Sequence, residues 1–296
     1  MPAAAATTSL ATATAVVHLE YDLETPPPLP SADWTRFVCI SDTHGQTCYV
    51  PPGDVLLHSG DLTEEGLLTE YRTTVEWLRE QPHPTKMIIA GNHDFSLDHH
   101  NDWYHNTFRR WHEHEQDVES IRELLTGSES REAGLIYLEN ETYHFQARPN
   151  GRKWSIYGSP WTPELFNWAF GYKRDLEANR IVAHYPQVDI LLTHGPPAGI
   201  LDKTNSGETV GCASLTARLP SIRPRLHVFG HIHEDHGAVI TKWDSISPQF
   251  AQGEATVHVN AANMPAGFRA RLPEGGYATF GSRPFQPVIV DLLDTV

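Results

Sequence analysis

The chain has 296 residues and a formal net charge of −15 with histidine counted neutral. This acidic balance excludes a general nucleic-acid-binding surface, because such surfaces neutralise phosphates with Lys and Arg, and no apolar stretch is long enough to span a membrane. The three scattered cysteines exclude a disulfide framework. We therefore expect a soluble, cytoplasmic protein without sequence-specific nucleic acid or membrane partners, whose oligomeric state the sequence leaves open.

Residues 1–35 differ in composition from the rest of the chain. Ala and Thr dominate as far as Val17, and the run from Pro26 to Pro30 resists both helix and sheet. Nothing in residues 36–296 has the composition of a linker. We therefore predict a flexible N-terminal arm over residues 1–35, followed by a single domain over residues 36–296.

Five short apolar runs predict strands that are covered on both faces. They are residues 37–40, 55–57, 87–90, 190–192 and 226–229. Residues 64–80 predict a helix with Thr63 as its N-cap, and this strand, helix, strand order calls for parallel pairing.

The middle and the end of the chain predict further elements. Residues 96–134 have a polar helical pattern and are expected to be an insertion. Residues 135–138, 142–145 and 154–157 predict strands without long helices between them, which favours a mixed second sheet with an antiparallel portion. A helix over residues 173–184 and late strands at 256–259 and 288–291 complete the expected α/β domain.

Each of the five apolar runs is followed by a motif of metal-binding residue types. Ligands gather beyond the carboxyl ends of parallel strands, so these motifs should meet in one crevice. In three of them a glycine precedes the ligand, and we expect it to let the chain turn sharply out of the strand. The motifs are Asp42-Thr43-His44, Gly60-Asp61, Gly91-Asn92-His93-Asp94, Thr193-His194-Gly195 and Gly230-His231-Ile232-His233.

These oxygen and imidazole ligands, without thiolates, suit two divalent or trivalent ions such as Mn, Fe or Zn. Asp61 can bridge the two ions through its two carboxylate oxygens. Asp42, His44 and His233 would complete the first set of ligands. Asn92, His194 and His231 would complete the second.

Two such cations can hold a water or hydroxide between them, lower its pKa and clamp phosphoryl oxygens during in-line attack. The sequence therefore predicts hydrolysis of a small phosphorylated substrate. His93 lies next to Asn92 but outside both ligand sets, and we expect it to be a catalytic residue that assists the leaving group. The sequence does not identify substrate-binding residues.

This ordered set of motifs resembles the calcineurin-like metallophosphoesterase superfamily. The resemblance implies an α/β fold in which a two-sheet β-sandwich of mixed strands, flanked by helices, carries a dinuclear metal centre. It also implies that Asp42, His44, Asp61 and His233 bind one metal and that Asp61, Asn92, His194 and His231 bind the other.

Further segments narrow the resemblance to a branch that contains animal metallophosphoesterase-domain proteins. These segments are residues 37–44, 56–61, 158–163, 210–212 and 224–230, and the similarity extends over residues 36–292. This branch implies a phosphodiesterase acting on a cyclic nucleotide or a similar small diester. Some animal members have glycine where this chain has His231, so the chain keeps a ligand that they lack. Asp94 stands where the branch often has glutamate.

Several alternatives remain open at this stage. The chain could be a phosphomonoesterase or a metal-binding scaffold without catalysis. It could also be a cysteine-dependent phosphatase, because Cys212 to Arg218 fits the Cys-x5-Arg pattern of that class. The loop between these two residues lacks a glycine, which disfavours this alternative. We expect His58 and His227 to have packing or supporting roles. The sequence also contains a cluster of histidines and a cluster of aromatic residues. For the histidines we favour solvated surface over a metal site; they are His99, His100, His105, His112 and His114. For the aromatic residues we favour core packing over a place in the substrate cleft; they are Trp161, Phe166, Trp168 and Phe170.

Overall fold

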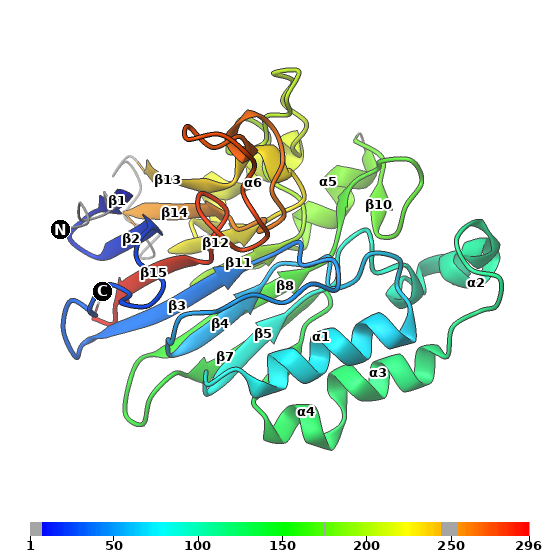
Figure 1. Cartoon of the computed structure of the whole chain (residues 1–296), viewed down its shortest axis with the longest axis horizontal. Helices are drawn as coiled ribbons and strands as arrows, with labels where there is room; N and C mark the ends of the chain where they lie inside the picture. Colours follow the sequence, from blue (N-terminus) through cyan, green and yellow to red (C-terminus); the bar gives the residue numbers. More distant parts are fainter. Residues whose placement is uncertain (1–7, 175, 244–253, 296) are drawn as a thin grey trace.

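The protein folds as two mixed β-sheets packed face to face between two groups of helices (Figure 1). We describe it from a computed structural model of residues 8–174, 176–243 and 254–295. One sheet has seven strands in the order β1-β2-β15-β3-β4-β5-β6, and the other has six in the order β13-β14-β12-β11-β8-β7. The predicted α/β sandwich is confirmed.

The seven-stranded sheet is parallel from β3 to β6, while β1, β2 and β15 run antiparallel to their neighbours. Its strands are β1 Thr8–Ala11, β2 Ala15–Glu20, β3 Trp34–Ile40, β4 Val55–His58, β5 Thr85–Ile88, β6 Leu135–Tyr137 and β15 Val288–Leu293. The prediction that residues 135–138 belong to the second sheet was wrong. The helical insertion is long enough for a crossover connection, so β6 pairs parallel with β5.

The six-stranded sheet is parallel in its centre and has antiparallel strands, β7 and β13, at its two edges. Its strands are β7 Glu141–Gln146, β8 Lys153–Ser159, β11 Ile190–Thr193, β12 Leu226–Phe229, β13 Gly237–Lys242 and β14 Ala255–Asn260. A small parallel pair, β9 Thr162–Pro163 and β10 Gly171–Tyr172, lies outside it.

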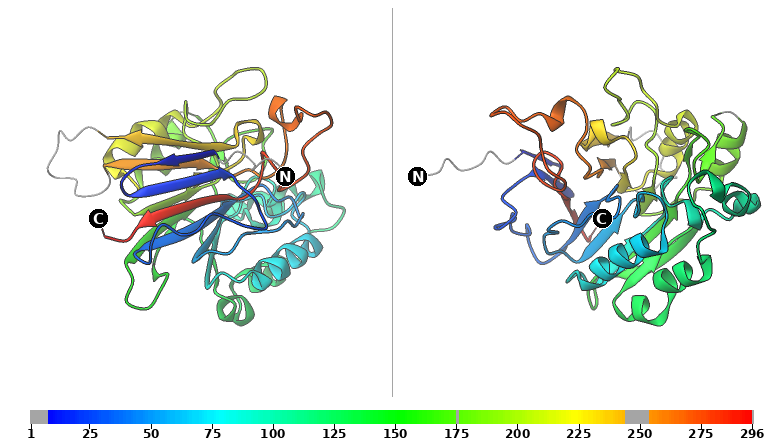
Figure 2. Two further views of the ribbon diagram at one scale, coloured as in Figure 1. Left: turned by 60° about the vertical axis from the view of Figure 1, so that its left-hand side comes forward. Right: turned by 45° about the vertical axis from the view of Figure 1, so that its right-hand side comes forward.

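The prediction of a flexible arm over residues 1–35 was wrong for the part of it that the structure describes. Strand β2 pairs with β15, and β1 pairs with β2 beside it (Figure 2, left). Ala15 and Val17 enter the core between the sheets because alternate strand residues face the same side. The Tyr21 hydroxyl donates to the Pro287 carbonyl at 2.6 Å, and Arg36 donates to the Pro27 carbonyl at 2.7 Å. Residues 1–7 lie outside the described part.

Apolar side chains form one core between the sheets and one beneath each group of helices. Helices α1 and α3 cover the outer face of the seven-stranded sheet, and α5 and α6 cover the other sheet. The helices are α1 Leu68–Glu80, α2 Trp103–Thr107, α3 Val118–Thr126, α4 Ser128–Glu132, α5 Leu176–Ala183 and α6 Ala213–Ile222. The short 3₁₀ turns are η1 Phe95–Leu97, η2 His100–Asp102, η3 Phe108–Arg110, η4 His233–Asp235 and η5 Phe268–Ala270.

Helix α1 begins later than predicted, because Thr63 does not cap it. The Thr63 hydroxyl donates to Asp94 at 2.8 Å and accepts from the Gly66 amide at 3.0 Å, so it holds a loop that precedes the helix. Within the residues described, no helix combines the length and the apolar character needed to cross a bilayer.

Candidate metal centre

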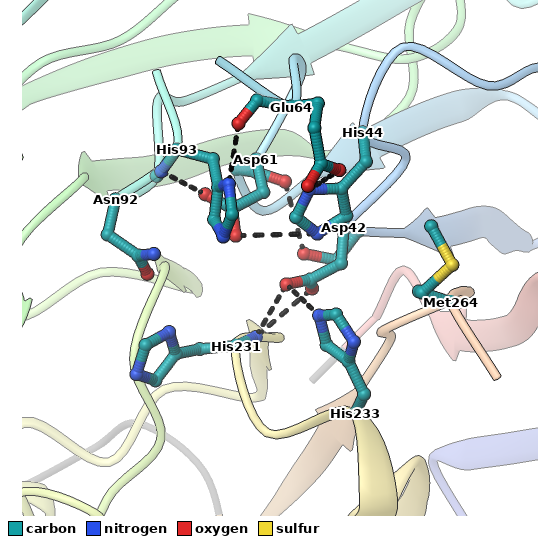
Figure 3. Close-up of polar contacts among 12 residues, drawn as sticks. Asp42, His44, Asp61, Glu64, Asn92, His93, His231, His233 and Met264 are labelled. Carbon is teal, nitrogen blue, oxygen red and sulfur yellow. Dashed lines mark hydrogen bonds and ion pairs between the residues drawn. The ribbon is translucent and has the colours of Figure 1, made fainter. Parts of the chain in front are cut away.

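The predicted ligands lie together where the loops leave the carboxyl ends of the parallel strands (Figure 3). Asp42 and His44 follow β3, Asp61 follows β4, and Asn92 and His93 follow β5. From the other sheet, His194 follows β11, and His231 and His233 follow β12. The site is therefore built where the two sheets meet, and each sheet contributes part of it.

The four side chains predicted for the first ion form a compact group. The donor atoms of Asp42, His44, Asp61 and His233 all lie within 4.8 Å of one another. His233 Nε2 is 3.1 Å from Asp42 Oδ1, and His44 Nε2 is 3.7 Å from Asp61 Oδ2. Two carboxylates and two imidazoles are a donor set that Zn, Mn and Fe accept.

The side chains predicted for the second ion lie on the other side of Asp61. His194 Nε2 is 3.4 Å from Asp61 Oδ1 and 2.8 Å from the Asn92 carboxamide oxygen. The ring centroids of His194 and His231 are 5.1 Å apart. The two oxygens of Asp61 thus face two different imidazoles, His44 through Oδ2 and His194 through Oδ1.

Four of these residues adopt a left-handed backbone that non-glycine residues rarely adopt. The φ angles are 54° at Asp42, 48° at His44, 53° at Asp61 and 68° at His231. Such conformations cost on the order of 1–3 kcal/mol each and cluster at functional sites. The sharp turns out of the strands, which we expected the glycines to make, are therefore made in part by the proposed ligand residues.

Close approach explains all three motif glycines that precede a ligand. A Cβ on Gly91 would lie 2.5 Å from the Asp61 backbone nitrogen and 2.6 Å from His194 Cε1, and a Cβ on Gly230 would overlap the Asp42 carboxylate. A Cβ on Gly60 would lie 2.6 Å from the Ala90 carbonyl oxygen and from His194 Nδ1, and with φ +106° this glycine of the three also needs its conformational freedom, as predicted. The glycines therefore let neighbouring ligand loops touch one another.

The electrostatics of the site favour a cation. Burial lowers the pKa of His44 and of His194, but neighbouring carboxylates outweigh the effect of burial and raise the pKa of each to about 9. These carboxylates are Glu64 and Asp61 for His44, and Asp61 for His194. Burial raises the pKa of Asp42, yet the hydrogen bond from His233 brings it down to about 2. His44 Nε2 is buried and makes no hydrogen bond within the residues that the structure describes. A buried imidazole nitrogen left unsatisfied beside a carboxylate fits a metal ligand.

Two acidic residues support the proposed ligands, and for Glu64 nothing in the sequence indicates this role. Asp94 is fully buried and accepts the amides of Gly91 and Leu62 at 2.7 and 3.1 Å, as well as the Thr63 hydroxyl. Burial, and then the charge of Asp61, raise its pKa to about 7. Glu64 Oε2 lies 3.1 Å from His44 Nδ1, which leaves His44 Nε2 to face Asp61. A carboxylate that holds the remote nitrogen of a ligand histidine fixes its tautomer.

His93 lies at the open side of the site. Its amide donates to Asp61 Oδ1 at 2.8 Å, and its Nδ1 is 2.6 Å from the Glu64 carbonyl. Nε2 makes no hydrogen bond within the part of the chain that the structure describes. Its ring makes edge contacts with His44 and Trp168, with centroid distances of 4.5 Å in each case. Trp168 therefore lies beside the site, while Phe170 is fully buried in the core under α1 and α3.

The structure rejects the cysteine-phosphatase pattern and one histidine prediction. Ala213 to Arg218 lie in helix α6, and Arg218 donates to the Tyr185 carbonyl at 2.8 Å, so no phosphate cradle forms. His112 is buried, where solvated surface was predicted. It lies 2.7 Å from the Tyr104 hydroxyl and 2.8 Å from the Glu65 carbonyl, because the insertion folds back onto the loop before α1.

His58 and His227 are fully buried and bind the ligand loops from within the sheets. His58 Nε2 lies 3.0 Å from the Thr43 hydroxyl, and His227 Nε2 lies 2.9 Å from the Thr193 hydroxyl. Burial lowers the pKa of both imidazoles, to about 3 for His58, so both stay neutral. Each holds the residue next to a ligand, as the predicted supporting role requires.

Comparison with known proteins agrees with this architecture. The family model described as calcineurin-like phosphoesterase matches residues 35–235. The chain belongs to this family. It is 37% identical over 246 residues to the human metallophosphoesterase domain-containing protein 1, covering 78% of this chain and 70% of that protein. A UPF0046 protein of Caenorhabditis elegans is 36% identical over 225 residues, covering 69% of this chain and 53% of the relative.

Proposed function

We propose that the chain is a phosphodiesterase that depends on two metal ions and hydrolyses a cyclic nucleotide or a similar small diester. The observation that carries the proposal is the position of Asp61, whose two oxygens face His44 on one side and His194 on the other. A carboxylate so placed can bridge two ions about 3.5–4 Å apart. Asp42, His44 and His233 would complete one ligand set, and Asn92, His194 and His231 the other.

The residues of the chain would divide the work as follows. Two bound cations would supply charge neutralisation for the phosphoryl oxygens and a lower pKa for the attacking water. Glu64 fixes the orientation of His44, and Asp94 holds the loop that carries Asn92 and His93. His93 contacts the Glu64 carbonyl through Nδ1, so its Nε2 points away from Glu64. We propose that Nε2 protonates the departing alkoxide.

The surroundings of His93 support an organic substrate. Trp168 packs at its edge, and Phe166, whose ring centroid is 5.8 Å from that of Trp168, is 72% exposed. An apolar or flat group on the leaving side of the phosphate could therefore lie against these rings. A bare phosphate would not use them.

The proposal is tested by measuring turnover of a panel of phosphodiesters and phosphomonoesters by the purified protein. We expect diesters to be preferred, activity to vanish on chelation and return with Mn²⁺, and thiol alkylation to have little effect. Preferential turnover of monoesters would favour a phosphomonoesterase. Bound metal without turnover of any ester would favour a scaffold.

A further inference from the structure

A second group of side chains that could bind a metal lies outside the candidate metal centre. The inference drawn from it does not depend on the proposed function. His99 and His100 come just after the 3₁₀ turn η1, and Glu139 comes just after β6. Their donor atoms lie within 4.8 Å of one another. We propose that these three residues bind a zinc-like divalent transition-metal ion that ties the helical insertion to the end of β6.

The distances fit a site that needs only small side-chain movements. His99 Nε2 and His100 Nε2 lie 3.8 and 3.9 Å from the same oxygen, Glu139 Oε1. Ligand atoms 2.0–2.1 Å from a tetrahedral ion are about 3.3 Å apart, so each histidine nitrogen must move closer to the Glu139 oxygen by about half an ångström. The side chains are 54%, 31% and 15% exposed, in the order His99, His100, Glu139, so a hydrated ion can reach them. A water would complete the coordination.

Two of the three ligands are already oriented by neighbouring groups. His100 Nδ1 lies 3.1 Å from Asp98 Oδ1, and the other oxygen of Asp98 accepts the Phe170 amide at 2.7 Å. Asp98 is buried and fixed, so His100 keeps its proton on Nδ1 and turns the lone pair of Nε2 toward Glu139. The Tyr137 hydroxyl donates to Glu139 Oε2 at 2.9 Å, which leaves Oε1 for the ion. Such carboxylate–histidine–metal arrangements typify metal sites in proteins.

Arg122, from helix α3, competes with the ion for His99. Its Nη2 is 2.7 Å from His99 Nδ1, and the Leu97 carbonyl is 3.1 Å from the same nitrogen. Arg122 can only donate, so its bond requires an unprotonated Nδ1 and places the proton on Nε2. An ion on Nε2 requires the opposite tautomer, in which Nδ1 donates to Leu97. Metal binding and the Arg122 contact therefore exclude each other.

The decisive experiment counts Zn²⁺ per full-length chain after equilibration with buffered free Zn²⁺, in wild type and in Glu139→Gln and His100→Gln. We expect each variant to hold one ion fewer than wild type and to keep the ions of the centre around Asp61. His105→Gln is the matched control, because His105 belongs to the same insertion and contacts Glu115 instead. It should bind as many ions as wild type.

A second measurement covers the case in which a variant is misfolded. Arg122→Met leaves all three ligands in place and should raise the affinity of this ion at least severalfold, measured by competition with a chelating dye. Hydrogen exchange of the amides around His100 should slow when Zn²⁺ is added to wild type. Equal ion counts in wild type and Glu139→Gln, or unchanged affinity in Arg122→Met, would overturn the proposal and leave these residues as a surface ion-pair cluster.

Discussion

Replacing Gly91 by alanine should remove the metals while leaving most of the fold intact. The new Cβ would lie 2.5 Å from the Asp61 nitrogen and 2.6 Å from His194 Cε1, whereas ordinary contacts begin at 3.4 Å. These two ligand residues must therefore move by about 0.8–0.9 Å, while metal–ligand distances tolerate only about 0.2 Å. Overpacking of this kind costs about 1–3 kcal/mol of stability.

The assay is metal content after dialysis against buffered Mn²⁺, with urea unfolding in the presence of a chelator as the measure of stability. Gly207→Ala is a suitable control. Gly207 has φ +81° and no atom within 4 Å of its added Cβ, so the substitution strains the backbone by about 1–2 kcal/mol without moving a ligand. Normal metal content and turnover in Gly91→Ala would refute the conclusion that the glycine is needed for close approach.

Three further predictions concern the ligands, the acid and the buried histidines. Asp61→Ala should lose both ions together, because cations at that spacing repel without an anion between them, and His231→Gly should weaken only the second; equal metal occupancy in wild type and Asp61→Ala would contradict the bridge. His93→Ala should keep its metals and lower kcat by about 10²–10⁴-fold for alkoxide leaving groups but less for nitrophenolate, and a uniform loss would leave His93 a positioning residue. Burial lowers the pKa of His236 and His258 to about 3, so both imidazoles stay neutral in the folded protein, whereas in the unfolded chain they take a proton near the usual pKa of about 6.5. The free energy of unfolding should therefore be highest above about pH 6.5 and should fall below that pH by up to about 1.4 kcal/mol per pH unit for each histidine. Urea unfolding in the presence of a chelator measures this slope, which should be smaller in His258→Gln.

The positions of the proposed metal ligands could be predicted because the signal is local. An apolar run followed directly by a ligand motif specifies both a buried strand and the edge at which it ends, so Asp42, Asp61 and His194 could be placed without their partners. The positions of Asn92, a proposed neutral ligand, and of the nearby His93 followed from the same pattern. The structure adds the close approach of the loops around Gly91, which depends on three strands at once.

The predictions that failed depend on contacts distant in sequence. Strand β2 is stabilised by β15, which lies at the other end of the chain, so its Ala- and Thr-rich surroundings concealed it. Glu64 looked like an ordinary first-turn helix residue, and only the folded loop brings it 3.1 Å from His44. His112 is buried because the insertion packs on the loop before α1, and its own sequence gives no sign of this.

The central claim is that catalysis needs two ions bridged by Asp61. It is tested most directly by removing the metals with a chelator, titrating Mn²⁺ into the metal-free protein and following hydrolysis of bis(4-nitrophenyl) phosphate. If the claim holds, turnover should remain low until more than one ion per chain is bound at the site around Asp61 and should then rise to its full value. The titration should be run in Glu139→Gln, so that the site proposed around His99 does not add to the count. Full activity with a single ion, or none with two, would contradict the account.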